Sequence, residues 1–210
     1  MKQITEYLSN KIVKPSIIKA EDKTIRNIVL SEISRLGYDA DLNHIDTSNV
    51  TTFYYETHPL FPEKFCGDVS KWNVENCITF TGMFYKCKNF NGYLNDWNMR
   101  MAKTVASMFR GCENFNQPLD QWEFESIDNA FCMFGDCFKF NQPLSEWNMY
   151  TATVTNRMFE NCKSFCQDLS SWKFHSGVNM IDMFAHCKKM KPALMPKAYL
   201  DYLKLMEKYK

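Results

Sequence analysis

Hydrophobic residues recur along this chain with a fixed period of 25 residues. All five tryptophans keep this spacing: Trp72, Trp97, Trp122, Trp147 and Trp172. A Met-Phe pair follows each tryptophan at a constant distance: Met83-Phe84, Met108-Phe109, Met133-Phe134, Met158-Phe159 and Met183-Phe184. A cysteine comes next in every unit: Cys87, Cys112, Cys137, Cys162 and Cys187. Such self-similarity is the signature of a tandem-repeat architecture.

The spacing of hydrophobic residues changes within each unit. Leu94, Trp97 and Met99 occupy the first, fourth and sixth positions of a short segment, and Trp97 and Met99 alternate with polar neighbours, as in a strand with one buried face. Further along, gaps of three, four and three residues predict a short amphipathic helix; the residues are Cys77, Phe80, Phe84 and Cys87. Each unit is therefore predicted to be a strand followed by a helix.

One such unit cannot bury its own aromatic side chains, so we expect the units to stack, with parallel strands about 4.8 Å apart. The predicted fold class is an α/β solenoid, a leucine-rich-repeat-like stack of strand-helix units with a parallel sheet and helical caps at both ends. The tryptophan and cysteine columns are expected to form its structural core. Asn91, Asn116 and Asn141 are expected to form a hydrogen-bonded ladder in the turn that leads back to the next strand.

The sequence divides into three parts. Residues 1–38 are predicted to be an N-terminal helical cap, residues 39–196 the repeats and residues 197–210 a C-terminal capping helix. The repeats begin with one degenerate 27-residue unit, which five 25-residue units follow. Apolar stripes at helical spacing support the caps: Ile25, Ile28, Val29, Ile33 and Leu36 at one end, and Tyr199, Tyr202, Leu203, Met206 and Tyr209 at the other. A further short helix is expected over the first twelve residues, from Ile4, Leu8 and Ile12.

Tracts such as CENFNQPLDQW and CFKFNQPLSEWNM resemble the BspA-type leucine-rich repeat family. The resemblance covers about three quarters of the chain and rests on a phenylalanine-asparagine-glutamine turn, a tryptophan-asparagine strand and a methionine-phenylalanine helix. It implies a binding scaffold whose ligand differs from member to member. Some members are displayed on bacterial surfaces, but this sequence shows neither a signal peptide nor a wall anchor.

Charge and composition indicate which partners, cofactors and activities are not expected for this chain. The 25 basic and 24 acidic side chains give a formal charge of +1, so neither nucleic acid nor an anionic membrane is indicated as partner. No stretch approaches the roughly 18 apolar residues of a membrane span, and we expect a soluble protein in the cytoplasm or inside a host cell. Nine cysteines without CxxC pairing and four scattered histidines predict reduced thiols, no metal and no cofactor. The sequence shows no acid, base and nucleophile that would converge on one site, so we do not expect an enzyme.

The candidate ligand-binding residues are those that flank each tryptophan on the exposed side of the predicted strand. They are Lys71, Asn73, Glu75, Asp96, Asn98, Arg100, Gln121, Glu123, Glu125, Glu146, Asn148, Tyr150, Lys173 and His175. The middle units are acidic, which favours a partner with a basic or amide-rich patch that engages Glu123, Glu125, Glu146 and Tyr150. A merely solvated face is the alternative.

Three functions follow from these features. The first is a non-enzymatic interaction module that binds another protein of unknown identity. The second is a structural subunit that self-associates into a larger phage, viral or cellular assembly. The third is an adhesin that is exported by an unrecognised route.

Overall fold

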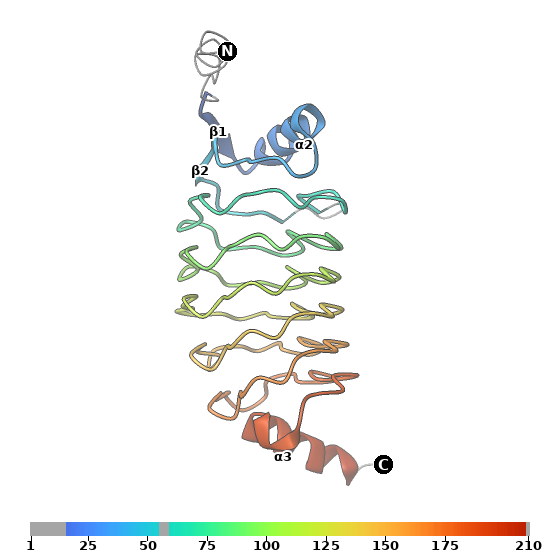
Figure 1. Cartoon of the computed structure of the whole chain (residues 1–210). Helices are drawn as coiled ribbons and strands as arrows, with labels where there is room; N and C mark the ends of the chain where they lie inside the picture. The colour runs from blue at the N-terminus through green and yellow to red at the C-terminus, as the bar shows by residue number, and fades with distance from the viewer. Residues whose placement is uncertain (1–15, 55–58, 209–210) are drawn as a thin grey trace.

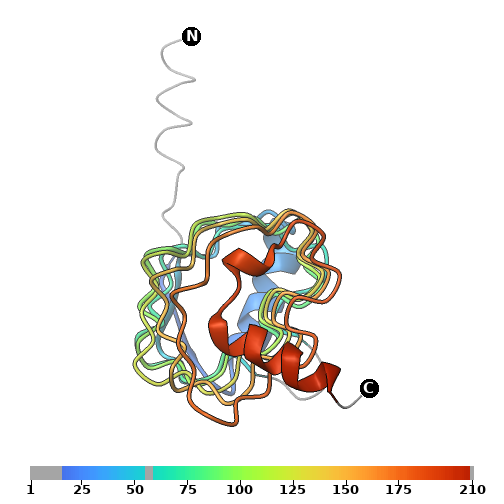
Figure 2. The same ribbon diagram turned by 90° about the horizontal axis from the view of Figure 1, so that it is seen from below.

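The computed structural model describes residues 16–54 and 59–208. The chain winds into a stack of similar coils, one above another, and a helix lies at each end of the stack (Figure 1). Viewed along the stack, the coils superimpose on a common outline (Figure 2). The elements are β1 (Ile18–Glu21), α2 (Ile25–Leu36), β2 (Ile45–Asn49), a 3-10 helix η1 (Pro192–Leu194) and α3 (Lys197–Glu207).

The prediction of an α/β fold built from strand-helix units is wrong. Within the described ranges, the two α-helices lie outside the 25-residue units, and the one sheet is the parallel pair of β1 and β2. The coils contain turns instead, and isolated parallel bridges join each coil to the next. The main ladder of bridges runs through Thr52, Thr79, Thr104, Asn129, Val154 and Asn179.

The predicted strand around each tryptophan is a turn. The amide of Trp97 donates a hydrogen bond to the carbonyl oxygen of Leu94 at 3.1 Å, and the amide of Ala102 donates to Met99 at 3.0 Å. Both bonds span three residues, as in β-turns, so this backbone does not pair with its neighbours as a strand would. The bridge of this coil comes later, at Thr104. Leu94 and Trp97 are both buried because the turn brings their side chains to the same side of the coil, which faces the interior of the stack.

The predicted helix is a run of successive turns. Alternate amides, those of Phe80, Gly82 and Phe84, donate at 2.9 Å to carbonyl oxygens of the next coil, those of Thr104, Ala106 and Met108. The intervening amides of Met83 and Tyr85 donate to carbonyls three residues back, at 3.2 and 3.0 Å. An α-helix would direct each amide to the residue four positions back. Here half of the amides bond to the adjacent coil, which ties the coils together.

Left-handed residues at two positions of each coil prevent a helix from forming there. They are Gly82, Ser107, Cys132, Arg157 and Asp182 in one column, and Lys86, Gly111, Asp136, Asn161 and His186 in the other. A left-handed conformation costs a non-glycine residue roughly 1–2 kcal/mol. The hydrogen bonds to the next coil offset this cost. Hydrophobic spacing alone does not distinguish such a run of turns from a helical turn.

Aromatic columns fill the interior. The rings of Phe84, Phe109, Phe134, Phe159 and Phe184 form one continuous stack, with neighbouring centroids 5.4–5.7 Å apart. The five tryptophans are only 1–4% exposed. Each indole Nε1 donates to a backbone carbonyl of the preceding coil; Trp122, for example, donates to Leu94 at 2.8 Å. This bond satisfies a polar group that burial would otherwise leave without a partner.

The cysteine column is bonded in the same way. The thiols of Cys112, Cys137 and Cys162 each donate to the carbonyl oxygen of the phenylalanine 28 residues earlier, at 3.0, 2.9 and 2.9 Å. All described cysteines are free of disulfides. A small side chain with a weak donor therefore fits this position, between the stacked rings and a backbone carbonyl.

The predicted asparagine ladder is present. The Oδ1 atom of Asn91 accepts the backbone amide of Asn116 at 2.8 Å, and the Oδ1 of Asn116 accepts that of Asn141 at 2.9 Å. Asn141 continues the series to the amide of Cys166 at 2.9 Å. Each asparagine thus fixes the turn of the next coil.

The two helices cover the ends of the stack. Ile25, Val29 and Ile33 of α2 are buried, whereas Leu36 is 42% exposed. At the other end, Tyr199 of α3 is buried and contacts Phe184 edge-on at 5.1 Å. Leu203 and Met206 remain exposed, while Tyr209 and the helix expected over the first twelve residues lie outside the described residues. The three-part division of the chain stays a prediction.

Candidate interaction surface

The side chains that flank each tryptophan lie on the outside of the stack. All of the candidate ligand-binding residues are exposed except His175, which is partly exposed. Between them, Trp97 and Met99 are buried, so polar and apolar side chains alternate across this segment although it is not a strand. The structure places these residues on successive coils, where they form adjacent columns. Their role in binding stays a prediction.

A shallow hollow lies on this surface between the coils of Trp97 and Trp122. It has a volume of about 480 Å³ and is lined by Asn95, Asp96, Trp97, Asn98, Met99, Arg100, Gln121 and Glu123. Asn95 is 7% exposed; its amide nitrogen donates to Asp120 at 3.1 Å, and its Oδ1 accepts the backbone amide of Gln121 at 3.1 Å. Asn95 therefore holds the two coils in register beneath the polar surface.

The middle of this surface is acidic. Its carboxylates are Asp96, Asp120, Glu123, Glu125 and Glu146, and its one basic residue over the same positions is Arg100. Five negative charges and one positive charge give a net charge of −4. We refer to these six residues as the acidic face. Asp120 was not among the predicted residues, because those lie one position before, one after and three after each tryptophan, whereas Asp120 lies two positions before Trp122.

Arg100 bridges two of the predicted contact residues. Its guanidinium bonds to the carboxylate of Glu123 and lies 3.7 Å from that of Glu125. Both glutamates are more than 60% exposed, so water screens these ion pairs. The bond to Glu123 holds the pKa of Arg100 above its usual value. Glu123 and Glu125 thus share one cation, whereas Glu146 has no ion-pair partner in the described part of the chain.

The comparison with known families matches most of the repeats. The family described as Mycoplasma protein of unknown function, DUF285, matches residues 29–139 and 101–196. The two overlapping matches span residues 29–196, or 168 of the 210 residues. The chain belongs to the DUF285 family. This family is one of the BspA-like repeat proteins, which agrees with the resemblance seen in the sequence at the level of the family. No curated protein and no solved structure matches the chain.

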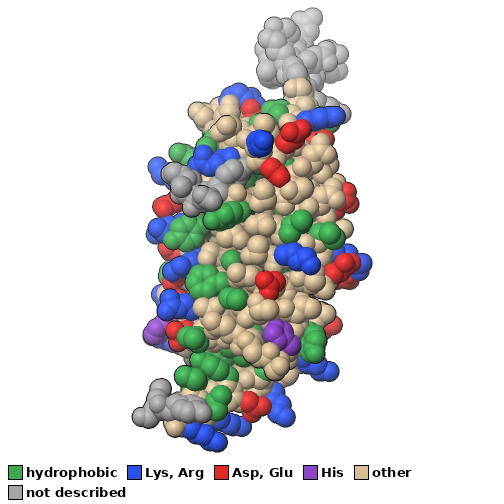
Figure 3. All heavy atoms as spheres, turned by 180° about the vertical axis from the view of Figure 1, so that it is seen from behind, with side chains coloured by type: hydrophobic (Ala, Val, Ile, Leu, Met, Phe, Trp, Pro, Cys, Tyr) green, Lys and Arg blue, Asp and Glu red, His purple; other side chains and the backbone are tan. Residues whose placement is uncertain are grey.

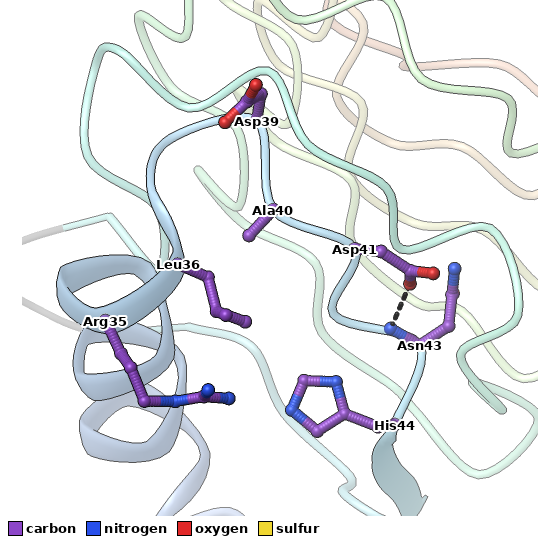
Figure 4. A pocket seen from close by; sticks show the side chains of 7 residues that line it. All are labelled: Arg35, Leu36, Asp39, Ala40, Asp41, Asn43 and His44. Carbon is purple, nitrogen blue, oxygen red and sulfur yellow. Dashed lines mark hydrogen bonds between the residues drawn. The ribbon is translucent and has the colours of Figure 1, made fainter. Parts of the chain in front are cut away.

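This DUF285 protein has a second hollow beside α2, of about 470 Å³ (Figure 4). Arg35 and His44 point toward each other across it, and Asp39, Asp41 and Asn43 form its far side. Glu32, which is 7% exposed, already contacts both Arg35 and His44. Glu32 accepts from Arg35 at 2.5 Å and lies 2.8 Å from Nε2 of His44. This cluster attaches α2 to the first coil.

The arrangement of Glu32 explains its acidity. The hydrogen bond from the Arg35 guanidinium lowers the pKa of Glu32 below its usual 4.5, although burial acts in the opposite direction. The carboxylate is therefore ionised at neutral pH. Its role is to hold the cap, since every contact it makes is to α2 itself or to the segment before β2.

The arrangement and burial of the titratable groups determine whether the described part of the DUF285 chain can hold a metal ion or a reactive thiol. Among residues 16–54 and 59–208, no group of three or more His, Cys, Asp or Glu side chains is placed to hold a metal ion. Burial raises the pKa of Cys112 and Cys137 well above its usual 9.0, so these thiols are protonated and poorly nucleophilic at neutral pH. No described helix has the length and apolarity needed to span a membrane.

Hydrophobic side chains on the surface are dispersed. Figure 3 shows one side of the stack, where hydrophobic side chains lie among polar side chains and backbone; most basic and acidic groups lie along the margins and a few lie in the middle. The larger exposed hydrophobic residues of the coils are Ile78, Tyr93, Met101, Tyr150 and Ile181.

Proposed function

We propose that this chain is a non-enzymatic, BspA-type repeat scaffold that binds a protein partner through the acidic face. The observation that supports it is the concentration of charge: five carboxylates and one guanidinium lie on neighbouring coils, although the whole chain has a formal charge of +1. The coils that carry them are fixed by backbone hydrogen bonds, by the buried tryptophans and by Asn95. A preformed surface loses little conformational entropy on binding.

The partner that fits this face is a basic protein surface. Electrostatic complementarity accelerates encounter and selects the partner, and it weakens as salt increases. Glu146 and Asp96 are exposed and lack ion-pair partners in the described chain, so their charge is available to a ligand. Arg100 positions Glu123 and Glu125 beside them. Tyr150, 56% exposed, adds an aromatic side chain with a hydrogen-bonding group on the same coil as Glu146.

A lysine-rich synthetic peptide is a suitable probe because it carries the expected chemistry without requiring the natural partner. Fluorescence anisotropy should show that the wild-type chain binds it at low salt and that the double variant Glu123→Lys, Glu146→Lys binds it at least tenfold more weakly. The matched control is Asp201→Lys, Glu207→Lys, which makes the same charge change on α3. Equal weakening in both variants, or none in either, would contradict a specific acidic face.

A further inference from the structure

A second charged surface lies along the turns of the last three coils. Five exposed lysines occupy it: Lys139, Lys163, Lys188, Lys189 and Lys191. We refer to them as the basic edge. They follow the cysteine column by one to four residues, on a different part of each coil from the side chains that flank the tryptophans. No acidic residue occupies the corresponding positions of these three coils.

The lysines of the basic edge form no ion pair with any described residue of the chain. In the earlier coils, Lys88 is paired with Glu113 at 3.0 Å. None of the five has a carboxylate within 4.0 Å in the described part of the chain. Lys163 instead lies over the ring of Phe138, 3.9 Å from its centroid. The nearby carboxylate of Asp136 accepts the side-chain amide of Asn161 at 2.8 Å. The basic edge therefore presents unneutralised positive charge to solvent.

We infer that the partner of the acidic face is a second copy of this chain, which binds through its basic edge. This inference rests on the proposed function, since it names a partner for the same acidic face. The two surfaces are opposite in charge, with a net −4 on the acidic face and five lysines on the basic edge. The near-neutral chain, with a formal charge of +1, experiences little overall repulsion between copies.

The periodicity of the stack favours a second copy over other basic partners. Charges on the acidic face lie on successive coils, and the stacked rings of Phe134 and Phe159 place neighbouring coils 5.5 Å apart. The lysines of the basic edge lie on consecutive coils of the same stack, so they too are separated by the distance between coils. Two copies laid side by side can therefore match charge against charge over several coils. An extended peptide, whose side chains on one face lie roughly 6.6–7 Å apart, does not keep this register.

The contact is expected along the sides of the stack rather than at its ends. At the ends, α2 and α3 cover the aromatic columns. The acidic face and the basic edge are different residues, so the contact between identical chains is heterologous. Such contacts leave one unused surface of each kind at the ends of an open assembly. Dimers and larger species should accordingly form together as the protein concentration rises.

Sedimentation velocity tests this inference with variants that reverse each surface. At about 30 mM salt the wild-type chain should associate in a concentration-dependent way, and at about 500 mM salt, where charges are screened, it should sediment as a 24.8 kDa monomer. Glu123→Lys, Glu146→Lys should remain monomeric, and so should Lys163→Glu, Lys188→Glu. A mixture of the two variants should associate again, because each supplies the charge that the other lacks.

Matched controls separate folding from association. Lys197→Glu, Lys204→Glu makes the same charge change on α3 and should associate like the wild type. Thermal unfolding should show that all variants are folded. A wild-type chain that stays monomeric at low salt over a hundredfold range of concentration would overturn the inference, as would a mixture that does not associate.

The outcome also separates this inference from the proposed function. A monomeric chain whose acidic face still binds the lysine-rich peptide would reject the second copy as partner and leave the acidic face as a binding surface. Loss of both peptide binding and self-association would reject both. Self-association that persists in the two reversed variants would place the contact elsewhere and likewise reject the inference.

Discussion

The indole of Trp147 donates a hydrogen bond to the carbonyl oxygen of Leu119, 2.9 Å away in the preceding coil. The same ring lies 6.0 Å from Trp122 and 6.4 Å from Trp172. Trp147 thus packs against the tryptophans of the neighbouring coils, and its hydrogen bond also fixes the position of its own coil relative to the preceding one. Equivalent bonds in the other units make this a general feature of the stack.

Trp147→Phe and Trp147→Ala should separate these two contributions. Phenylalanine keeps much of the ring but leaves the buried carbonyl of Leu119 without its donor, at a cost of about 1–3 kcal/mol in the free energy of unfolding. Alanine also leaves a cavity, at a cost of about 3–5 kcal/mol. Urea unfolding measures both. Glu146→Ala, an exposed neighbour, is the control and should change stability by less than about 0.5 kcal/mol. Equal effects of the three substitutions would contradict the structure.

Asn116→Ala should destabilise the turns that the asparagine ladder connects. The substitution removes the acceptor of the Asn141 amide, which we expect to cost about 1–3 kcal/mol. Asn116→Asp keeps an oxygen acceptor at the same place and should be milder at neutral pH. Urea unfolding of the two variants checks this order. If aspartate and alanine prove equally destabilising, the side-chain oxygen is not the important group.

Alkaline pH should destabilise the protein through its buried thiols. Burial raises the pKa of Cys77 to about 12, and it raises the pKa of Cys112 and Cys137 well above the usual 9.0. The folded state therefore retains these protons when the unfolded state begins to lose them. Their stabilisation is complete below pH 9 and is lost as pH rises toward 12. Each such thiol contributes a slope of about 1.4 kcal/mol per pH unit in that range.

Urea unfolding between pH 8 and pH 10.5 measures this slope. The triple variant Cys77→Ala, Cys112→Ala, Cys137→Ala should be less stable at pH 8 but should lose stability less steeply above pH 9. The comparison of slopes does not depend on the absolute stability of the variant. Parallel pH profiles for the variant and the wild type would show that these thiols do not remain protonated in the folded state.

Acid should weaken the attachment of α2. The hydrogen bond from Arg35 lowers the pKa of Glu32, so the stabilisation by its carboxylate is present above pH 4.5 and is lost as pH falls through its lower folded value. Glu32→Gln should reduce stability by about 1–3 kcal/mol at pH 7. Thermal unfolding should show that the difference in stability between the variant and the wild type narrows as pH falls below 4.5. Glu21→Gln, in an exposed position, is the control and should match the wild type throughout.

Much of the repeat organisation was predictable because identical side chains recur where the core requires them. The tryptophan, phenylalanine and cysteine columns are visible as letters at a fixed interval, and these residues are buried in the structure. The secondary structure was not predictable from the same pattern. Leu94 and Trp97 are joined by a turn, yet their spacing also suits a leucine-rich-repeat strand.

The run of turns was the harder feature to foresee. Gly82, Gly111 and Asn161 are residue types that favour the left-handed conformation, and they share the two special columns. Lys86 and Arg157 occupy the same columns, but lysine and arginine do not favour the left-handed conformation. Their backbone conformation is imposed by hydrogen bonds to the adjacent coil, which a search for local periodicity does not detect.

The surface was predictable in outline only. Alternation around each tryptophan indicated the exposed side chains, but it did not show that Arg100 joins Glu123 and Glu125 of the next coil. The alternation also did not point to Asp120 or to the lysines of the basic edge. Contacts between coils depend on how two segments lie side by side, and their pairing of polar residues is not encoded in the repeat period.

Alternate amides in the Met-Phe segment bond to the next coil rather than along a helix, and these bonds can be detected directly. Nuclear magnetic resonance can detect the scalar coupling that a hydrogen bond transmits from an amide nitrogen to the carbonyl carbon of its acceptor. The structure predicts that the Phe134 amide couples to the carbonyl of Met158, to which it donates at 2.9 Å. Coupling to the carbonyl of Ala130, as in an α-helix, would contradict it.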